Sequence, residues 1–240
     1  MTVKFLPSGD SAIVVEFGSQ IDRGVSERVL RLSMRIRTSG LTGVIETVPT
    51  FRSLMVHYDP LQTSSATLVD AIGTLLDAAG RLEQRQRLWR VPVCYEGDYA
   101  PDLATVAERT NLTTAEVVEL HSRTQYHVYM IGFLPGFPYM GDLPERLALP
   151  RQVDPRLRVP AGSVAIAMAM TAIYPIESPG GWHLIGTTPI VMFDLASTRP
   201  ALFAPGDAVK FDPIGEDDYA AIRAAVADGR YEVPHERMVA

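Results

Sequence analysis

Residues 126–193 read YHVYMIGFLPGFPYMGDLPERLALPRQVDPRLRVPAGSVAIAMAMTAIYPIESPGGWHLIGTTPIVMF. Glycine, proline and aromatic residues are denser in this stretch than in the rest of the chain. Glycine and proline occur where a backbone turns sharply or comes close to another group. We therefore expect shaped loops between short strands. Loops of this kind on a rigid scaffold are where binding and catalysis concentrate.

The middle of the stretch predicts a strand. Between residues 164 and 170, Val, Ile and Met alternate strictly with Ala, as in a small barrel with a tight interior. A helix is the competing interpretation, because Ala and Met are good helix formers. The flanking Pro and Gly residues favour the strand. Further strands are expected at residues 190–193 and 208–211, and a final helix at residues 218–227.

Before this stretch, the N-terminal part of the sequence predicts the order strand–helix–strand–strand–helix. The expected strands are residues 12–17, 44–48 and 53–58, and a strand at 88–94 would complete a ferredoxin-like βαββαβ pattern. Asp22 is the expected cap of the first helix, and Gly80 ends the second. Helices are also expected at 102–110 and 113–123, the latter opened by a Thr113–Glu116 capping box. Composition changes between residues 81 and 90, which predicts domains at 1–86 and 87–240.

Composition is that of an ordinary globular chain. The 240 residues are 47% hydrophobic and 21% charged, with a net charge of −6, which suits two modest domains. No Lys/Arg cluster is dense enough for nucleic-acid binding. The single cysteine, Cys94, fits a reducing, cytoplasmic compartment and is expected to be a buried, inert thiol. Residues 159–176 carry no charged side chain, but proline and glycine interrupt them, so no membrane span is expected.

Common catalytic signatures are absent from the sequence. It contains no GxxxxGK[ST] phosphate loop, no GxGxxG, no HExxH and no GxSxG. The five histidines show no close metal-ligand spacing, so no metal site is expected. What remains is a constellation of three loop segments at residues 132–141, 156–163 and 177–183.

These segments allow two interpretations. Arg158 suits recognition of a carboxylate or phosphate, and a turn at residues 179–181 would present backbone N–H groups to an anion. His183 invites interpretation as a general base, although a polar loop residue is the simpler interpretation. The structural alternative is that the prolines and glycines only shape barrel turns and that the aromatic residues are core.

The motifs GFLPGFPY (132–139), RVPAGSV (158–164), IYP (173–175), SPGGW (178–182), LIG (184–186) and PGDAVKF (205–211) resemble one known family. It is the group of the 5-oxoprolinase B subunit, kinase A inhibitor and allophanate hydrolase subunit 1. The resemblance implies an α+β protein, with a small ferredoxin-like α+β N-terminal domain followed by a cyclophilin-like β-barrel C-terminal domain. It also implies an ATP-dependent conversion of 5-oxo-L-proline to L-glutamate, with ATP as co-substrate of a complex.

The partners implied are a larger cyclophilin-like subunit and a third, hydrolytic subunit. Other family members imply two alternatives: an inhibitor of a sensor histidine kinase, or an allophanate hydrolase type subunit of urea breakdown. The sequence has Met170-Thr171-Ala172 where the family usually has Gln-Thr-Gly, and His183 where relatives often have Gln. We therefore assign no catalytic role to His183.

The resemblance and the loop constellation together predict one wall of a ligand site, completed by another subunit, so that the single chain is inactive. Replacing Arg158 or Trp182 by Ala is expected to spare the fold. The predicted ligand-binding residues are Gly132, Phe133, Pro135, Gly136, Phe137, Pro138, Tyr139, Arg158, Pro160, Gly162, Ser163, Thr171, Tyr174, Ser178, Pro179, Gly180, Gly181 and Trp182.

Overall fold

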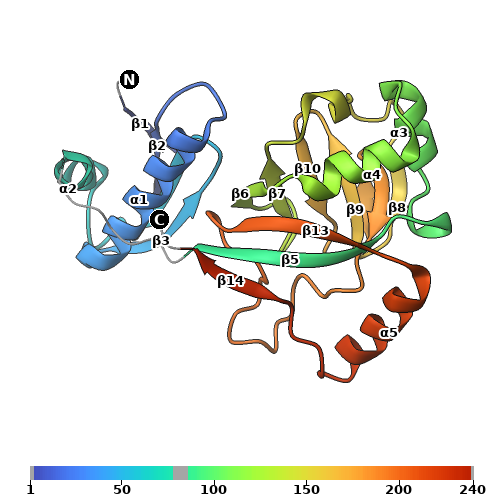
Figure 1. Cartoon of the computed structure of the whole chain (residues 1–240). Coiled ribbons are helices and arrows are strands. Elements are labelled where there is room, and N and C mark those ends of the chain that lie inside the picture. Colours follow the sequence, from blue (N-terminus) through green and yellow to red (C-terminus); the bar gives the residue numbers. More distant parts are fainter. Residues whose placement is uncertain (1–2, 78–85, 239–240) are drawn as a thin grey trace. The chain divides into compact units, whose positions relative to one another are not determined.

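The computed structural model describes residues 3–77 and 86–238. These residues fall into two compact units, one before and one after the gap between them (Figure 1). Each unit has its own hydrophobic core. The two are therefore described separately.

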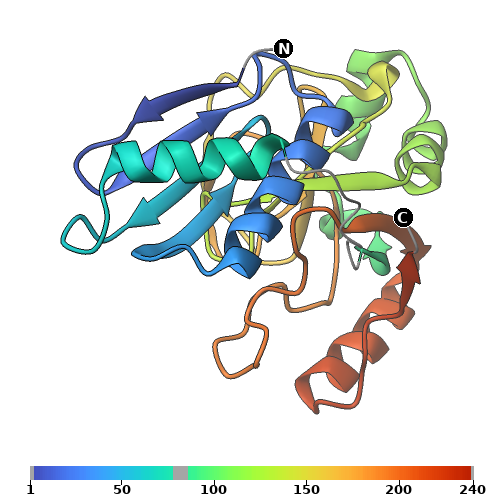
Figure 2. The ribbon, with the colours of Figure 1, turned by 90° about the vertical axis from the view of Figure 1, so that its left-hand side faces the viewer.

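The first unit is a four-stranded antiparallel sheet with two helices. Its strands are β1 (Lys4–Pro7), β2 (Ala12–Glu16), β3 (Val44–Pro49) and β4 (Ser53–Tyr58), in the order β1-β2-β4-β3. Helices α1 (Arg23–Ser39) and α2 (Ser65–Asp77) lie on one face of this sheet (Figure 2). They pack their apolar faces against alternate residues of β2 and β4. Asp22 caps α1 as predicted, by accepting from the Val25 N–H at 3.0 Å.

The predicted closing strand of this sheet, at residues 88–94, is wrong. Residues 88–94 belong to strand β5 (Gln86–Cys94), which lies in the second unit. The edge beside β2 is taken instead by β1, which the sequence pattern did not predict. Val91–Cys94 are buried throughout, which suits a strand covered on both faces rather than a sheet edge. The predicted cap at Gly80 lies outside the described residues.

The second unit is built on a closed barrel. Seven strands follow the order β12-β9-β10-β7-β6-β13-β5, and a β12–β5 pairing between Thr187 and Cys94 closes the ring. The bounds not yet given are β6 (Tyr126–Ile131), β7 (Pro138–Gly141), β9 (Ser163–Ala167), β10 (Met170–Ile173), β12 (His183–Thr187) and β13 (Ala208–Ile214). Strand β14 (His235–Met238) extends the sheet beyond β5. Strands β8 (Arg156–Val159) and β11 (Ser178–Gly180) form a separate two-stranded ladder.

The helices of this unit are close to those predicted. They are α3 (Leu103–Thr110), α4 (Thr114–Arg123) and α5 (Glu216–Ala227), with short 3₁₀ turns at Gly97–Tyr99 and Glu145–Leu147. The capping box is confirmed: Thr113 Oγ1 accepts from the Glu116 N–H at 3.2 Å, and Glu116 accepts from the Thr113 N–H at 2.8 Å. No helix in the described ranges is long and apolar enough to cross a bilayer.

Two strand predictions in the barrel are wrong. The alternating run is a hairpin, because the chain turns at Met168, which has a positive φ of 56° and is exposed. Residues 190–193 form no strand, and only Phe193 makes an isolated bridge, to Ala201. The alternation itself is confirmed on β9, where Val164 and Ile166 point into the barrel core. The alanines between and after them face a second, smaller cluster.

The α+β class is confirmed by this closed barrel and separate small sheet. The ferredoxin-like and cyclophilin-like assignments, and the boundary at residues 86 and 87, stay predictions.

Candidate functional site

An aromatic cluster forms where the predicted loop segments meet. It consists of Phe133, Phe137, Tyr139, Tyr174 and Trp182. Phe137 is at its centre, with ring-centroid distances of 5.5 Å to Phe133, 5.0 Å to Tyr139, 5.2 Å to Tyr174 and 6.1 Å to Trp182. Ala165, Ala167 and Ala172 pack against these rings. Small residues on β9 and β10 thus make room for large ones from the loops.

The loop between β6 and β7 presents Phe133 to solvent. Gly136 has a φ of 77°, and a Cβ there would lie 2.8 Å from the Cβ of Phe193, so only glycine fits this turn. Phe133 itself has a φ of 72° and is 65% exposed. A bulky residue at positive φ is uncommon and is held there by its surroundings. The turn therefore maintains a strained backbone that exposes an aromatic ring.

A cation borders the aromatic cluster. The Arg151 guanidinium lies 5.9 Å from the ring centroid of Trp182, within reach of a cation–π interaction. Burial raises the pKa of Tyr139 and of Tyr174, and the Arg151 charge only partly opposes this. Both phenols are therefore neutral donors at physiological pH. The sequence motifs did not single out Arg151, because its surroundings in the chain carry no pattern that would have revealed it.

Arg158 forms an exposed ion pair. Its Nε and Nη2 donate to the two carboxylate oxygens of Glu177 at 2.9 and 3.0 Å. Both side chains are more than half exposed. The hydrogen bonds from Arg158 lower the pKa of Glu177. An anion that binds Arg158 must therefore compete with this carboxylate or share the guanidinium with it.

Arg156, two residues earlier, has a different role. Its Nη2 donates to Asp102 Oδ1 at 2.5 Å. Gln152 joins the two, accepting from Arg156 at 2.9 Å and donating to Asp102 at 3.1 Å. Asp102 also accepts from the Leu184 N–H at 2.7 Å. This network ties the start of α3 to β8 and β12, so Arg156 holds the framework beneath the loops.

The predicted site residues divide by burial. Exposed members are Phe133, Pro135, Arg158, Pro160 and Pro179. Half-buried members are Gly132, Tyr139, Gly180 and Gly181. Buried members are Gly136, Phe137, Pro138, Gly162, Ser163, Thr171, Tyr174, Ser178 and Trp182. Trp182 is only 6% exposed, which contradicts the expectation that Trp182→Ala spares the fold, because emptying a buried Trp site costs about 3–5 kcal/mol.

The turn predicted at residues 179–181 is also wrong, whereas anion binding by these residues stays a prediction. Ser178–Gly180 is a strand that pairs with β8. A Cβ on Gly180 would lie 2.2 Å from Tyr174 Oη. The Gly181 carbonyl accepts from the Gln152 N–H at 2.8 Å. These glycines allow close packing.

Thr171 and His183 are both inside the unit. The Thr171 hydroxyl donates to the Ala165 carbonyl oxygen at 3.1 Å and lies 2.9 Å from His121 Nε2. His183 is 1% exposed, with Nε2 2.9 Å from the Pro150 carbonyl oxygen. Nδ1 of His183 and Oγ of Ser178 are buried without a hydrogen-bond partner among the described residues. Neither position is accessible to a ligand in solvent.

No nucleophile of the usual kinds stands out among the described residues. Cys94 is fully buried, and burial raises the pKa of its thiol, which disfavours the reactive thiolate. Across residues 3–77 and 86–238, no three His, Cys, Asp or Glu side chains are grouped so as to hold a metal ion. What the site offers to a ligand is the exposed ring of Phe133, the exposed Arg151 and Arg158, and the half-buried phenol of Tyr139. These groups suit the binding of a ligand rather than its chemical conversion.

The comparisons with known proteins agree on the family to which this chain is similar. The family described as "Carboxyltransferase domain, subdomain C and D" matches residues 3–203. The 5-oxoprolinase B subunit of Bacillus subtilis (strain 168) is 40% identical over 236 residues, covering 93% of this chain and 98% of that protein. The 5-oxoprolinase B subunit of Escherichia coli O157:H7 is 39% identical, covering 85% of this chain and 93% of that protein.

More distant and longer proteins contain the same region. The urea amidolyase of Lachancea kluyveri is 24% identical over 269 residues, and the match spans 15% of that protein. The crystallised protein TTHA0988 is similar to this chain with a TM-score of 0.75 and 35% identity over 85% of it. The match spans 39% of the TTHA0988 chain. By sequence match over nearly its whole length, the chain belongs to the family of 5-oxoprolinase B subunits, within the wider carboxyltransferase subdomain C and D group.

Proposed function

We propose that this chain is the B subunit of an ATP-dependent 5-oxoprolinase that converts 5-oxo-L-proline to L-glutamate in the cytoplasm. The observation that carries the proposal is the 40% identity to the Bacillus subtilis protein over nearly the full length of both chains. Phosphoryl transfer from ATP to the lactam oxygen would activate the carbonyl carbon. Addition of water and cleavage of the ring C–N bond then release the glutamate amine, with ADP and phosphate as the other products.

We further propose that this chain supplies one wall of the site. It carries no phosphate-loop motif, and the described residues around the aromatic cluster include no nucleophile paired with a base. The exposed Phe133 ring, held at positive φ, suits burial against a partner, since exposed aromatic residues are enriched at interface cores. A larger cyclophilin-like subunit would cover it, and a third subunit would complete the hydrolytic machinery.

Reconstitution tests the proposal directly. The purified chain is mixed with its two proposed partner subunits, and ATP-dependent glutamate release is measured. We expect turnover from the three-subunit mixture and none from the single chain. A complete mixture without activity would reject the assignment, and a single chain that turns over at the rate of the mixture would reject the one-wall site.

Two variants, each with a matched control, test whether Arg158 and Phe133 belong to the proposed site. Arg158→Gln is compared with Arg123→Gln, because Arg123 also forms an exposed ion pair, with Glu119 on α4. Phe133→Ala is compared with Leu195→Ala, an apolar side chain that is 82% exposed. We expect Arg158→Gln to lower turnover at least tenfold and Phe133→Ala to weaken subunit association at least tenfold. Equal behaviour of each variant and its control would show that these residues lie outside the site.

A further inference from the structure

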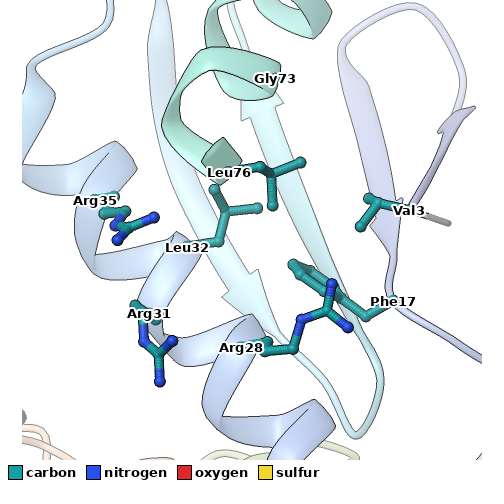
Figure 3. Close-up of a pocket in the computed structure, with 8 residues that line it drawn as sticks. All are labelled: Val3, Phe17, Arg28, Arg31, Leu32, Arg35, Gly73 and Leu76. Carbon is teal, nitrogen blue, oxygen red and sulfur yellow. The ribbon is translucent and has the colours of Figure 1, made fainter. Parts of the chain in front are cut away.

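A pocket of about 380 Å³ lies in the first unit and is lined by none of the residues of the aromatic cluster (Figure 3). This volume is in the range of small-molecule sites, about 300–1,000 Å³. One wall is α1, which contributes three arginines and Leu32. The remaining lining comes from Val3, Phe17 and two residues of α2, Gly73 and Leu76. Among the described residues, the lining thus combines three cations with the half-buried apolar side chains of Val3 and Leu76 and contains no carboxylate, while Phe17 and Leu32 lie in the core beneath.

The three arginines lie along one side of α1. Positions 28, 31 and 35 recur at helical spacing and span about 10 Å at 1.5 Å per residue. The Arg28 guanidinium lies 5.0 Å from the ring centroid of Phe17. Arg35 Nη1 donates to the Leu75 carbonyl oxygen at 2.7 Å. Arg31 is exposed and forms no hydrogen bond or ion pair with another described residue. Two cations are therefore held in position at the pocket, and a third remains available for a ligand.

Gly73 keeps the pocket open. It lies inside α2, where glycine is less favourable than alanine because it loses more conformational freedom on folding. A Cβ at Gly73 would meet no atom within 4 Å, so close packing does not require glycine here. Because Gly73 lines the pocket, a larger side chain would occupy pocket volume. The glycine is thus explained by the space it preserves.

We propose that this pocket binds a small organic anion, with a carboxylate or phosphate head on an apolar body. The head pairs with Arg31, beside the anchored Arg35 guanidinium, and the body packs on the half-buried side chains of Val3 and Leu76. A guanidinium recognises either head with two parallel hydrogen bonds. The proposal is independent of the oxoprolinase assignment, since it concerns a separate site and its test needs no partner subunit.

The test is an NMR titration of the ¹⁵N-labelled full chain, reading backbone amides and arginine Nε–Hε signals. The probes are hexyl phosphate, hexanoate, 1-hexanol and inorganic phosphate. We expect saturable shifts at the pocket residues with hexyl phosphate or hexanoate, and the tighter of the two identifies the head. The neutral alcohol and the free phosphate should bind at least tenfold more weakly. Inorganic phosphate that binds as tightly as hexyl phosphate would mean an adventitious ion only, and no saturable shift with either amphipathic probe would reject the site.

Variants separate the pocket from general charge. Arg31→Gln and Gly73→Leu are each expected to weaken probe binding at least tenfold. Arg37→Gln is the matched control, because Arg37 is exposed on the same helix but does not line the pocket. Unchanged amide signals from strands β1–β4, which contribute no residue to the pocket lining, check that the first unit is folded. Arg31→Gln alone decides the outcome if Gly73→Leu does not fold, and wild-type affinity in Arg31→Gln would overturn the proposal.

Discussion

His121 is a neutral histidine sealed inside the second unit. Its ring stacks on Phe211 at 4.6 Å between centroids. Because the Thr171 hydroxyl donates to a carbonyl, it accepts from His121 Nε2, so Nδ1 accepts from the Tyr95 hydroxyl at 2.8 Å. Both ring nitrogens are satisfied only in the uncharged tautomer. Burial accordingly lowers the pKa of His121 to about 3.

This histidine makes stability depend on pH. Between pH 6.5 and about 3 the unfolded chain binds a proton that the folded chain excludes, so the free energy of unfolding falls as the pH falls through that window. The expected contribution is about 1.4 kcal/mol lost between pH 7.5 and 5.5. Urea denaturation at the two pH values measures it. His121→Gln should remove this contribution and His235→Gln, at an exposed position, should keep it; equal pH dependence in all three proteins would contradict the assignment.

Gly180 is required by the ring packed on it. Gly180→Ala would place a Cβ 2.2 Å from Tyr174 Oη and 2.8 Å from its Cζ, and overpacking of this kind costs about 1–3 kcal/mol. Gly181→Ala is the control, because its Cβ would meet its nearest neighbour at 3.4 Å. Thermal denaturation should show a lower midpoint for Gly180→Ala alone. Equal midpoints for the two variants would show that the ring moves away without cost.

At the scale of elements, Asp102 joins α3, β8 and β12. Arg156→Gln leaves this nearly buried carboxylate without its cation, and the expected loss is about 1–3 kcal/mol, because the 30% exposed Arg156 side chain places the pair between buried and surface cases. Arg158→Gln, which breaks an exposed pair, should change stability by less than about 0.5 kcal/mol. Chemical denaturation of the two variants tests the contrast. A larger loss from Arg158→Gln would reverse the roles assigned to these arginines.

The helices were predictable and several strands were not. Helix signals such as the Asp22 cap and the Thr113–Glu116 box are local, and both are present in the structure. Strand identity depends on distant partners, so the pattern at residues 88–94 did not reveal its pairing with β13. The turn at Met168 lacks glycine, proline or asparagine and gave no turn signal.

The same limit applies to the site. Side chains of the first and third loop segments do meet in one cluster, which the loop constellation and the family resemblance together predicted. Which side chains face solvent was not predictable, because burial of Trp182 depends on Phe137 and Tyr139 from another loop. Arg156 and Arg158 are two residues apart on β8, yet the Arg156 side chain is mostly buried and the Arg158 side chain is exposed. Each environment depends on partners that are distant in the sequence, Asp102 and Glu177.

At the scale of the molecule, the barrel closes at a seam that has no spare room. Gly186 on β12 faces β5, and a Cβ there would lie 2.6 Å from Val93 Cγ1 and 3.1 Å from the Cys94 carbonyl oxygen. Gly186→Ala should therefore destabilise the chain by about 1–3 kcal/mol. The double variant Gly186→Ala/Val93→Ala removes the clashing methyl group, and a double-mutant cycle should show favourable coupling. Strictly additive losses would locate the strain elsewhere.

The pairing of β5 with β13 also sets an order of events during synthesis. Trp89 of β5 is bonded to Asp207, 118 positions later, and β5 runs parallel to β13 along seven residue pairs. At about 5–20 residues per second, a ribosome needs roughly 6–24 seconds to deliver the second strand after the first. The elements of the first unit are all contained in residues 3–77, so they can fold during that interval. Until β12 and β13 have been synthesised, the apolar run Val91–Cys94 lacks both of these partner strands, and we expect chaperones to bind a nascent chain that exposes it.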